Sequence, residues 1–250
     1  MKYLNLPIRY KKPRSCGITS LHDISCSLGE LRYILEDYSS FVDLAKLGVG
    51  TAAIIPNLKE KIQVYKSFNI DVYFGGTLFE KFYYQNKLDK NKKVLESFEI
   101  SIVEISTGTI DISLEERLVL VEDFSKNFEV FSEVGCKDSN KIMPPSEWIK
   151  EIKSFLSAGC KYVITEGRNS GNAGLYRPNG ELRTGLISDI ITTLGYEKLI
   201  FEAPNSESQN YFINLLGANV NLGNIAPKDI LLLESQRQGL RSETFFIKWS

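Results

Sequence analysis

The sequence predicts an α/β protein whose single domain forms a (β/α)8 barrel, the TIM-barrel architecture. A short apolar run ending in a polar or charged residue is followed by an amphipathic stretch with helical spacing, and this unit recurs eight times in 250 residues. Hydrophobic residues make up 43% of the chain, which is enough to bury one large core. Eight such units in one chain of this length are what a barrel of eight parallel strands requires.

The predicted elements alternate along the whole chain. Strand-like runs lie at residues 17–23, 41–46, 70–76, 101–106, 128–135, 161–166, 198–202 and 219–224. Apolar residues with helical spacing follow them at 28–38, 58–68, 78–98, 114–127, 148–158, 186–194, 206–216 and 228–240. Because a helix separates each strand from the next, neighbouring strands are expected to be parallel.

Local signals support several of these boundaries. Ser113 and Glu116 have the spacing of a capping box, which predicts the start of the fourth helix. Pro144 and Pro145 precede the fifth helical stretch, and Pro227 suits the first position of the last helix. Residues 1–16 form a lead-in to the barrel domain at 17–250, and the long polar loop at 168–183 is predicted to act as a lid or as a substrate-clamping segment.

Composition narrows the classes of function. The chain has 30 basic and 31 acidic residues, and the resulting net charge of -1 provides no overall attraction for nucleic acid or an anionic membrane. The apolar runs are only as long as strands, and the N-terminus lacks the apolar segment of a signal peptide. These features predict a cytoplasmic protein that acts through a local site, and they leave a homo-oligomer open.

Several kinds of catalytic machinery are disfavoured. The single histidine, His22, and the lack of a G-x-S-x-G turn argue against a nucleophilic triad, and no P-loop pattern is present. Residues 48–53 match a relaxed dinucleotide pattern, but they follow the second strand and no acidic residue ends the next one. Adjacent strand residues point to opposite faces, so if Asp23 faces the barrel interior, His22 packs outward against helices.

Carboxylates stand at the ends of four successive strands. Glu104, Glu133, Glu166 and Glu202 occupy these positions, and the C-terminal ends of barrel strands meet at one rim. We therefore expect the four side chains to point into one cavity and to hold a divalent cation, Mg²⁺ or Mn²⁺. An alternative is that some of them only form ion pairs across the barrel top with Lys46 or other rim cations.

Substrate-binding groups are expected around the same rim. Phosphate sites of barrels commonly form after strands seven and eight, where Asn221, Gly223 and Asn224 lie in the sequence. Gly223 would let the backbone approach a ligand, although a glycine needed only for a turn explains it equally well. The ends of the first and third strands add Asp23 and Thr77 to the predicted substrate-binding residues.

Nine collinear segments resemble the phosphosulfolactate synthase family over nearly the whole chain. They are Lys12-Pro-Arg14 with Gly17-Ile-Thr19 and Asp23; Asp43-Leu-Ala-Lys46 with Gly50-Thr51; Gly75-Gly-Thr-Leu-Phe-Glu80; Val103-Glu-Ile-Ser106; Glu133-Val-Gly135 with Lys137; Glu166-Gly-Arg168 with Ser170-Gly171; Phe201-Glu-Ala-Pro204; Val220-Asn-Leu-Gly-Asn-Ile225; and Leu233-Glu234 through Arg237 to Gly239-Leu-Arg241.

The resemblance implies a Mg²⁺-dependent addition of sulfite to phosphoenolpyruvate, which gives phosphosulfolactate, an early step toward coenzyme M or sulfolactate. Attack on the methylene carbon would push charge onto the substrate carboxylate, where Mg²⁺ held by glutamates would stabilise it. Lys137 is then the expected general acid that protonates the neighbouring carbon. Lys46 and Arg168 would bind phosphate or carboxylate, and Ser170 joins the substrate-binding residues.

Four positions depart from the family pattern beside the predicted site. Ile24 and Cys136 stand where the pattern has lysines, and Thr107 and Asn169 stand where it has acidic residues. Two basic and two acidic groups are therefore lost together, which keeps the net charge balanced and is compatible with a site reshaped for another substrate or with one that has lost its activity. The alternatives are a heat-stress-associated-like binding protein, a lyase acting on another phosphorylated acid, or an aldolase that uses Lys46 as a Schiff base.

Overall fold

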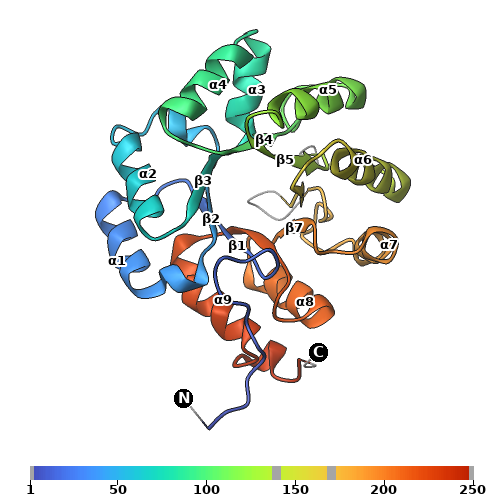
Figure 1. Ribbon diagram of the computed structural model, residues 1–250. Helices are drawn as coiled ribbons and strands as arrows, with labels where there is room; N and C mark the ends of the chain where they lie inside the picture. Colours follow the sequence, from blue (N-terminus) through green and yellow to red (C-terminus); the bar gives the residue numbers. More distant parts are fainter. Residues whose placement is uncertain (1–2, 137–141, 168–172, 248–250) are drawn as a thin grey trace.

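The computed structural model describes residues 3–136, 142–167 and 173–247. Eight strands form a closed barrel in sequence order, with every neighbouring pair parallel and β8 pairing with β1 (Figure 1). The strands are β1 Thr19–Asp23, β2 Leu44–Leu47, β3 Asp71–Phe74, β4 Ile102–Ile105, β5 Glu129–Val134, β6 Tyr162–Thr165, β7 Leu199–Glu202 and β8 Leu222–Ile225. The predicted single-domain (β/α)8 barrel is confirmed.

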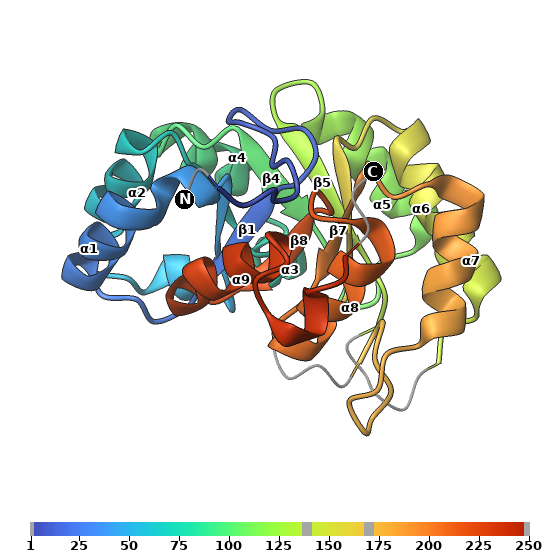
Figure 2. The same ribbon diagram turned by 90° about the horizontal axis from the view of Figure 1, so that it is seen from below.

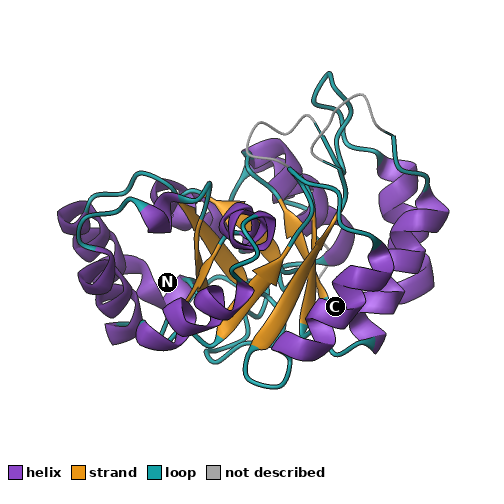
Figure 3. Cartoon of the chain, turned by 90° about the horizontal axis from the view of Figure 1, so that it is seen from above, coloured by secondary structure: helices purple, strands orange, loops and turns teal. Residues whose placement is uncertain are grey.

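A ring of helices surrounds the strands (Figures 1 and 3). They are α1 Leu28–Tyr38, α2 Leu58–Ser67, α3 Gly76–Tyr84, α4 Leu88–Ser97, α5 Leu114–Phe124, α6 Pro145–Ser157, α7 Thr184–Leu194, α8 Ser206–Leu216 and α9 Ile230–Arg237, with short 3-10 turns at Ser39–Phe41, Thr51–Ala53, Pro227–Asp229 and Ser242–Thr244. Among the described residues, no helix is both long and apolar enough to cross a membrane.

One predicted helix is wrong. The stretch 78–98 forms two helices, α3 and α4, because the chain turns sharply between Tyr84 and Leu88. Asn86 has a φ of 55°, a left-handed conformation that asparagine tolerates and that ends a helix. The predicted cap at Ser113 is present, since its side chain accepts a hydrogen bond from the Glu116 N–H at 3.2 Å.

Two apolar layers determine which strand residues face the barrel interior. The larger layer fills the space between strands and helices and includes Leu21 of β1 together with Ala45 and Leu47 of β2. A smaller cluster fills the lower part of the barrel itself and consists of Ile18, Leu44, Tyr73, Ile102, Phe131, Tyr162, Ile164 and Ile200. Strand residues alternate between these two layers, so the side chains above the inner cluster form the mouth of the barrel.

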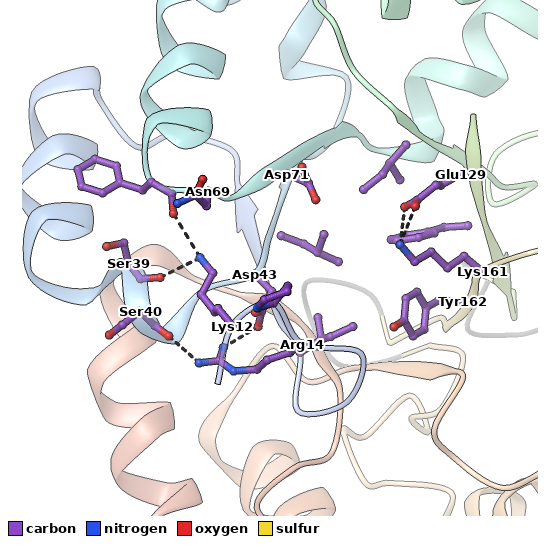
Figure 4. A pocket seen from close by; sticks show the side chains of 16 residues that line it. Lys12, Arg14, Ser39, Ser40, Asp43, Asn69, Asp71, Glu129, Lys161 and Tyr162 are labelled. Carbon is purple, nitrogen blue, oxygen red and sulfur yellow. Dashed lines mark hydrogen bonds and ion pairs between the residues drawn. The ribbon is translucent and has the colours of Figure 1, made fainter. Parts of the chain in front are cut away.

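The N-terminal end of the barrel holds a separate cavity of about 560 Å³, which Figure 4 shows from close by. The Lys12 ammonium donates to the carbonyl oxygens of Ser39 and Phe68, both at 3.3 Å. Arg14 donates to the Asp43 carboxylate at 2.8 Å. These bonds attach the N-terminal segment to the bottom of the barrel, so we assign it a structural role there.

Candidate active site

A cavity of about 230 Å³ opens at the C-terminal end of the strands. It is lined by His22, Lys46, Gly48, Val49, Gly75, Gly76, Thr77, Glu104, Glu133, Glu166, Glu202 and Asn224. All four predicted glutamates therefore face one cavity, as expected. Their residues are only 1 to 5% exposed, and so many buried carboxylates require compensating donors or cations.

Glu104 is held by the first turn of α3. The Gly76 N–H donates to Glu104 Oε1 at 2.6 Å, so the carboxylate caps the positive end of the helix. A Cβ atom on Gly76 would lie 2.1 Å from the Ser106 hydroxyl oxygen and 2.7 Å from Glu104 Oε1. A glycine is therefore needed for this close approach between the helix and β4.

Lys46 joins the two sides of the mouth. Its Nζ lies 2.6 Å from Glu202 Oε1 and 4.0 Å from Glu104 Oε2, and all three side chains are buried. Burial opposes protonation of the lysine, but Glu202 and Glu104 outweigh it and raise its pKa well above the ordinary value. The amine is therefore held as an ammonium, which disfavours the Schiff-base aldolase interpretation because that chemistry needs a neutral amine.

Glu202 is kept ionised by its donors. Burial alone would raise the pKa of this carboxyl, but Lys46, the Gly167 N–H at 2.9 Å and the charge of His22 together lower it. The residue is also the last of β7, and its carbonyl oxygen accepts from the Tyr176 hydroxyl at 3.0 Å. Tyr176 thereby ties the segment after β6 to the strand that carries Glu202.

Three of the glutamates form a group that fits a divalent cation. Glu133, Glu166 and Glu202 each place a carboxylate oxygen so that the three oxygens lie within 4.8 Å of one another. Oxygens that ligate Mg²⁺ at about 2.1 Å are at most about 4.2 Å apart, so small side-chain rotations would complete the shell. Glu104 is not part of this group and contacts Lys46 and α3 instead.

The structure reverses the expectation for His22 and Asp23. His22 lines the cavity, whereas the fully buried Asp23 points outward to α2, where it lies 2.6 Å from Lys61 Nζ and accepts from the Tyr65 hydroxyl at 2.8 Å. Asp23 does not line this cavity, so its position lends no support to the predicted substrate-binding role, which stays a prediction. A buried lysine on α2 pairs with the aspartate and thereby determines which face of β1 turns inward.

The expected phosphate segment is only partly at the mouth. β8 begins at Leu222, so Asn221 lies at its N-terminal end, where its amide donates to the carbonyls of Glu197 and Leu199. Gly223 lies inside the barrel below the cavity, where a Cβ would meet Ile200 at 3.0 Å. Neither Asn221 nor Gly223 lines the cavity, so their predicted role in substrate binding gains no support from their positions and stays a prediction.

Asn224 and Thr77 remain at the mouth. Asn224 has a left-handed φ of 59°, is 5% exposed, and its Oδ1 has no hydrogen-bond partner among the described residues. That oxygen is placed to receive a bond from a ligand or a bound water. Thr77 lies in the first turn of α3, where the helix N-terminus favours anions.

Three predicted residues, Lys137, Arg168 and Ser170, lie outside the described residues, as does the departure at Asn169. The other departures, Ile24, Thr107 and Cys136, are described and do not line the cavity. Residues 173–183 project beyond the barrel mouth (Figures 2 and 3). Their movement as a lid stays a prediction.

A further residue was not singled out by sequence reasoning. Glu80 of α3 is buried and its carboxylate accepts from the Ser106 hydroxyl and from three consecutive backbone N–H groups, those of residues 108, 109 and 110, at 2.6 to 3.0 Å. It thereby holds the segment that follows β4 beside Glu104. The helical pattern alone gives no signal for this role, because the groups that donate to the Glu80 carboxylate are distant from it in sequence.

Comparison with known proteins identifies relatives over the full barrel. The family model of (2R)-phospho-3-sulfolactate synthase matches residues 7–243. The chain is 40% identical to phosphosulfolactate synthase of Bacillus subtilis, with 98% of each chain covered, and 37% identical to that of Methanothermobacter thermautotrophicus, with 95% of each covered. The solved YdjI aldolase of Escherichia coli K12 has a TM-score of 0.56 at 10% identity, covering 90% of this chain and 86% of its own, which shows the shared fold alone.

Proposed function

The chain belongs to the (2R)-phospho-3-sulfolactate synthase family, and we propose from this that it catalyses the Mg²⁺-dependent addition of sulfite to phosphoenolpyruvate. The observation that carries the proposal is the set of four buried glutamates around Lys46 in one cavity. This cavity combines a site for a divalent cation with groups that bind anions, as a reaction between two anionic substrates requires. The cytoplasmic location and a homo-oligomeric state stay predictions.

Mg²⁺ would be held by Glu133, Glu166 and Glu202, whose oxygens already converge. When bound, it would supply Lewis-acid stabilisation of negative charge that develops on substrate oxygens. Glu104 lies apart from that group. Glu104 and Glu202 together keep Lys46 in its ammonium form. The carboxylates thus have two tasks, holding the cation and maintaining the charge of the lysine.

The chain's own groups then bind and orient the substrates. The Lys46 ammonium and the N-terminus of α3 at Thr77 attract the carboxylate and phosphate of phosphoenolpyruvate. The sulfur lone pair of sulfite forms the new C–S bond at the methylene carbon, and the double-bond electrons move toward the carboxylate. Lys137, which follows β5 in the sequence, would deliver a proton to the neighbouring carbon, and Arg168 and Ser170 would contact substrate from the loop after β6.

The test is a reaction of purified protein with phosphoenolpyruvate, sulfite and Mg²⁺, followed by mass spectrometry of the product. We expect phosphosulfolactate at enzyme-like rates, with no product when sulfite or phosphoenolpyruvate is left out. Absence of product together with no binding of phosphoenolpyruvate at millimolar concentration would overturn the proposal. It would favour a relative whose site has changed or lost this activity.

A further inference from the structure

The mouth of the barrel is divided into two chemically different halves. The C-terminal ends of β4, β5 and β7 and the residue after β6 contribute the four glutamates. In contrast, β8, β1 and β2 contribute Asn224, His22 and Lys46, which all carry N–H donors. The three donor strands are direct neighbours, since β1 pairs with both β8 and β2. Without a bound cation the glutamate half repels an anion in the cavity, whereas the half with the N–H donors attracts it.

His22 is fixed at the centre of the donor half. In the pairing of β1 with β2 it stands opposite Lys46, and both side chains turn into the barrel. The next residue, Asp23, is held on the outer face by Lys61 and Tyr65 of α2, so the strand cannot turn His22 away from the cavity without breaking a buried ion pair.

Gly48 provides the space that the imidazole occupies. A Cβ atom on Gly48 would lie 1.8 Å from His22 Nε2 and 2.3 Å from Cδ2. The ring therefore rests directly on the backbone of the turn after β2, and any larger residue at position 48 would displace it. Two segments of the chain, β1 and the turn after β2, are thus built around this one side chain.

We infer that His22 is a substrate-binding residue, whose imidazole N–H donates to an oxyanion placed between it and Lys46. The ligand class is a small oxyanion, which is sulfite or the phosphoryl group of the phosphorylated substrate. The identity of the anion rests on the proposed function, but the presence of an anion site beside His22 does not. If His22 serves only to balance the charge of Glu202, no anion will reach it.

His22 is the only histidine of the chain, so its ring gives one set of imidazole NMR signals that needs no assignment by mutation. The experiment titrates the Mg²⁺-loaded protein, labelled at histidine, with sulfite, with inorganic phosphate and with phosphoenolpyruvate in separate series. We expect a saturable shift of the ring signals with at least one of them. A shift with sulfite alone places the nucleophile at His22, and a shift with phosphate and phosphoenolpyruvate places the phosphoryl group there.

Variants test the same site by affinity. His22→Leu keeps the bulk but removes the donor, and we expect it to raise the dissociation constant of the responding anion about tenfold, as for loss of one hydrogen bond to a charged group. His22→Gln, which restores an N–H donor, should recover part of the affinity. Gly48→Ala should weaken binding like His22→Leu, whereas Gly29→Ala, with nothing within 4 Å of the added Cβ, should not.

The two proposals fail in distinguishable ways. If wild-type protein forms no phosphosulfolactate but phosphate shifts the imidazole signals and His22→Leu weakens that binding, the proposed function is wrong and the anion site stands. If the wild type is active but none of the three anions shifts the signals, or His22→Leu with an unchanged melting temperature binds them as well as the wild type does, the role of His22 is refuted.

Discussion

Replacing Lys46 by methionine tests the electrostatic account of the cavity. Methionine replaces all of the side chain except the terminal nitrogen, and it leaves Glu202 and Glu104 buried without the ammonium that lies 2.6 Å and 4.0 Å away. Removal of one partner of a buried pair costs about 3–5 kcal/mol because the other charge stays buried and uncompensated. We therefore expect Lys46→Met to lower the free energy of unfolding by about that amount at pH 7.

The loss should depend on pH in a defined direction. In the wild type the pKa of Glu202 is lowered, so its charge stabilises the fold above the pKa of the unfolded chain and this contribution disappears as the pH falls through the folded-state pKa. In Lys46→Met burial dominates and raises the pKa of Glu202. Protonation of this carboxyl at acid pH therefore removes the destabilising buried charge from the variant. The difference between the two proteins should therefore narrow from about pH 7 to about pH 4.

Urea unfolding in the presence of a chelator, at several pH values, measures this difference. Lys161→Met is the matched control, since Lys161 pairs with Glu129 at 2.7 Å while their side chains are 46% and 44% exposed, against 7% and 2% for Lys46 and Glu202. An exposed ion pair of similar length should contribute no more than about 1 kcal/mol to the free energy of unfolding. The reasoning is refuted if Lys46→Met lowers the free energy of unfolding as little as Lys161→Met does. It is also refuted if the decrease caused by Lys46→Met is the same at every pH.

Four further substitutions separate the roles of the site residues. Glu133→Gln should weaken Mg²⁺ binding in calorimetry more than Glu104→Gln does, because only Glu133 belongs to the converging group, and equal affinities in both variants and wild type would exclude this ligand set. Lys137→Ala should lower kcat on the order of 10²-fold with a smaller change in the KM of phosphoenolpyruvate, and an unchanged kcat would remove it as the general acid. Glu80→Gln should lower the free energy of unfolding by about 1–3 kcal/mol and speed hydrogen exchange at residues 108–110, and unchanged exchange there would show that Glu80 does not hold this segment.

Much of the fold could be predicted because strand and helix periodicity is a local property of the sequence. The helices α1 and α8 begin and end at the expected residues, since each has both an N-cap and a clear apolar face. The break between α3 and α4 was missed because apolar spacing continues on both sides of Asn86. The left-handed backbone conformation of this single residue does not interrupt the apolar periodicity.

The site residues could be predicted where their position along a strand alone determines whether they lie at the barrel mouth. The four glutamates lie at or within one residue of the C-terminal ends of successive parallel strands, and topology alone brings such ends together. His22 and Asp23 were reversed because two polar neighbours give no indication of which faces inward, and the deciding partners, Lys61 and Tyr65, are about 40 residues away. Asn221 was misplaced because β8 starts at Leu222, which shifts the whole segment along the barrel axis.

The most direct test of the central claim compares product formation by wild type and Glu166→Gln under the same conditions, with Mg²⁺ and with a chelator. Glu166 is 1% exposed in the converging carboxylate group, and the substitution removes its charge at nearly constant volume. We predict that wild type forms phosphosulfolactate from phosphoenolpyruvate and sulfite only with Mg²⁺, and that Glu166→Gln, folded to the same extent, loses at least about 10²-fold in rate. Equal rates in the two proteins, or formation of product undiminished by the chelator, would contradict the assignment of this cavity as the active site.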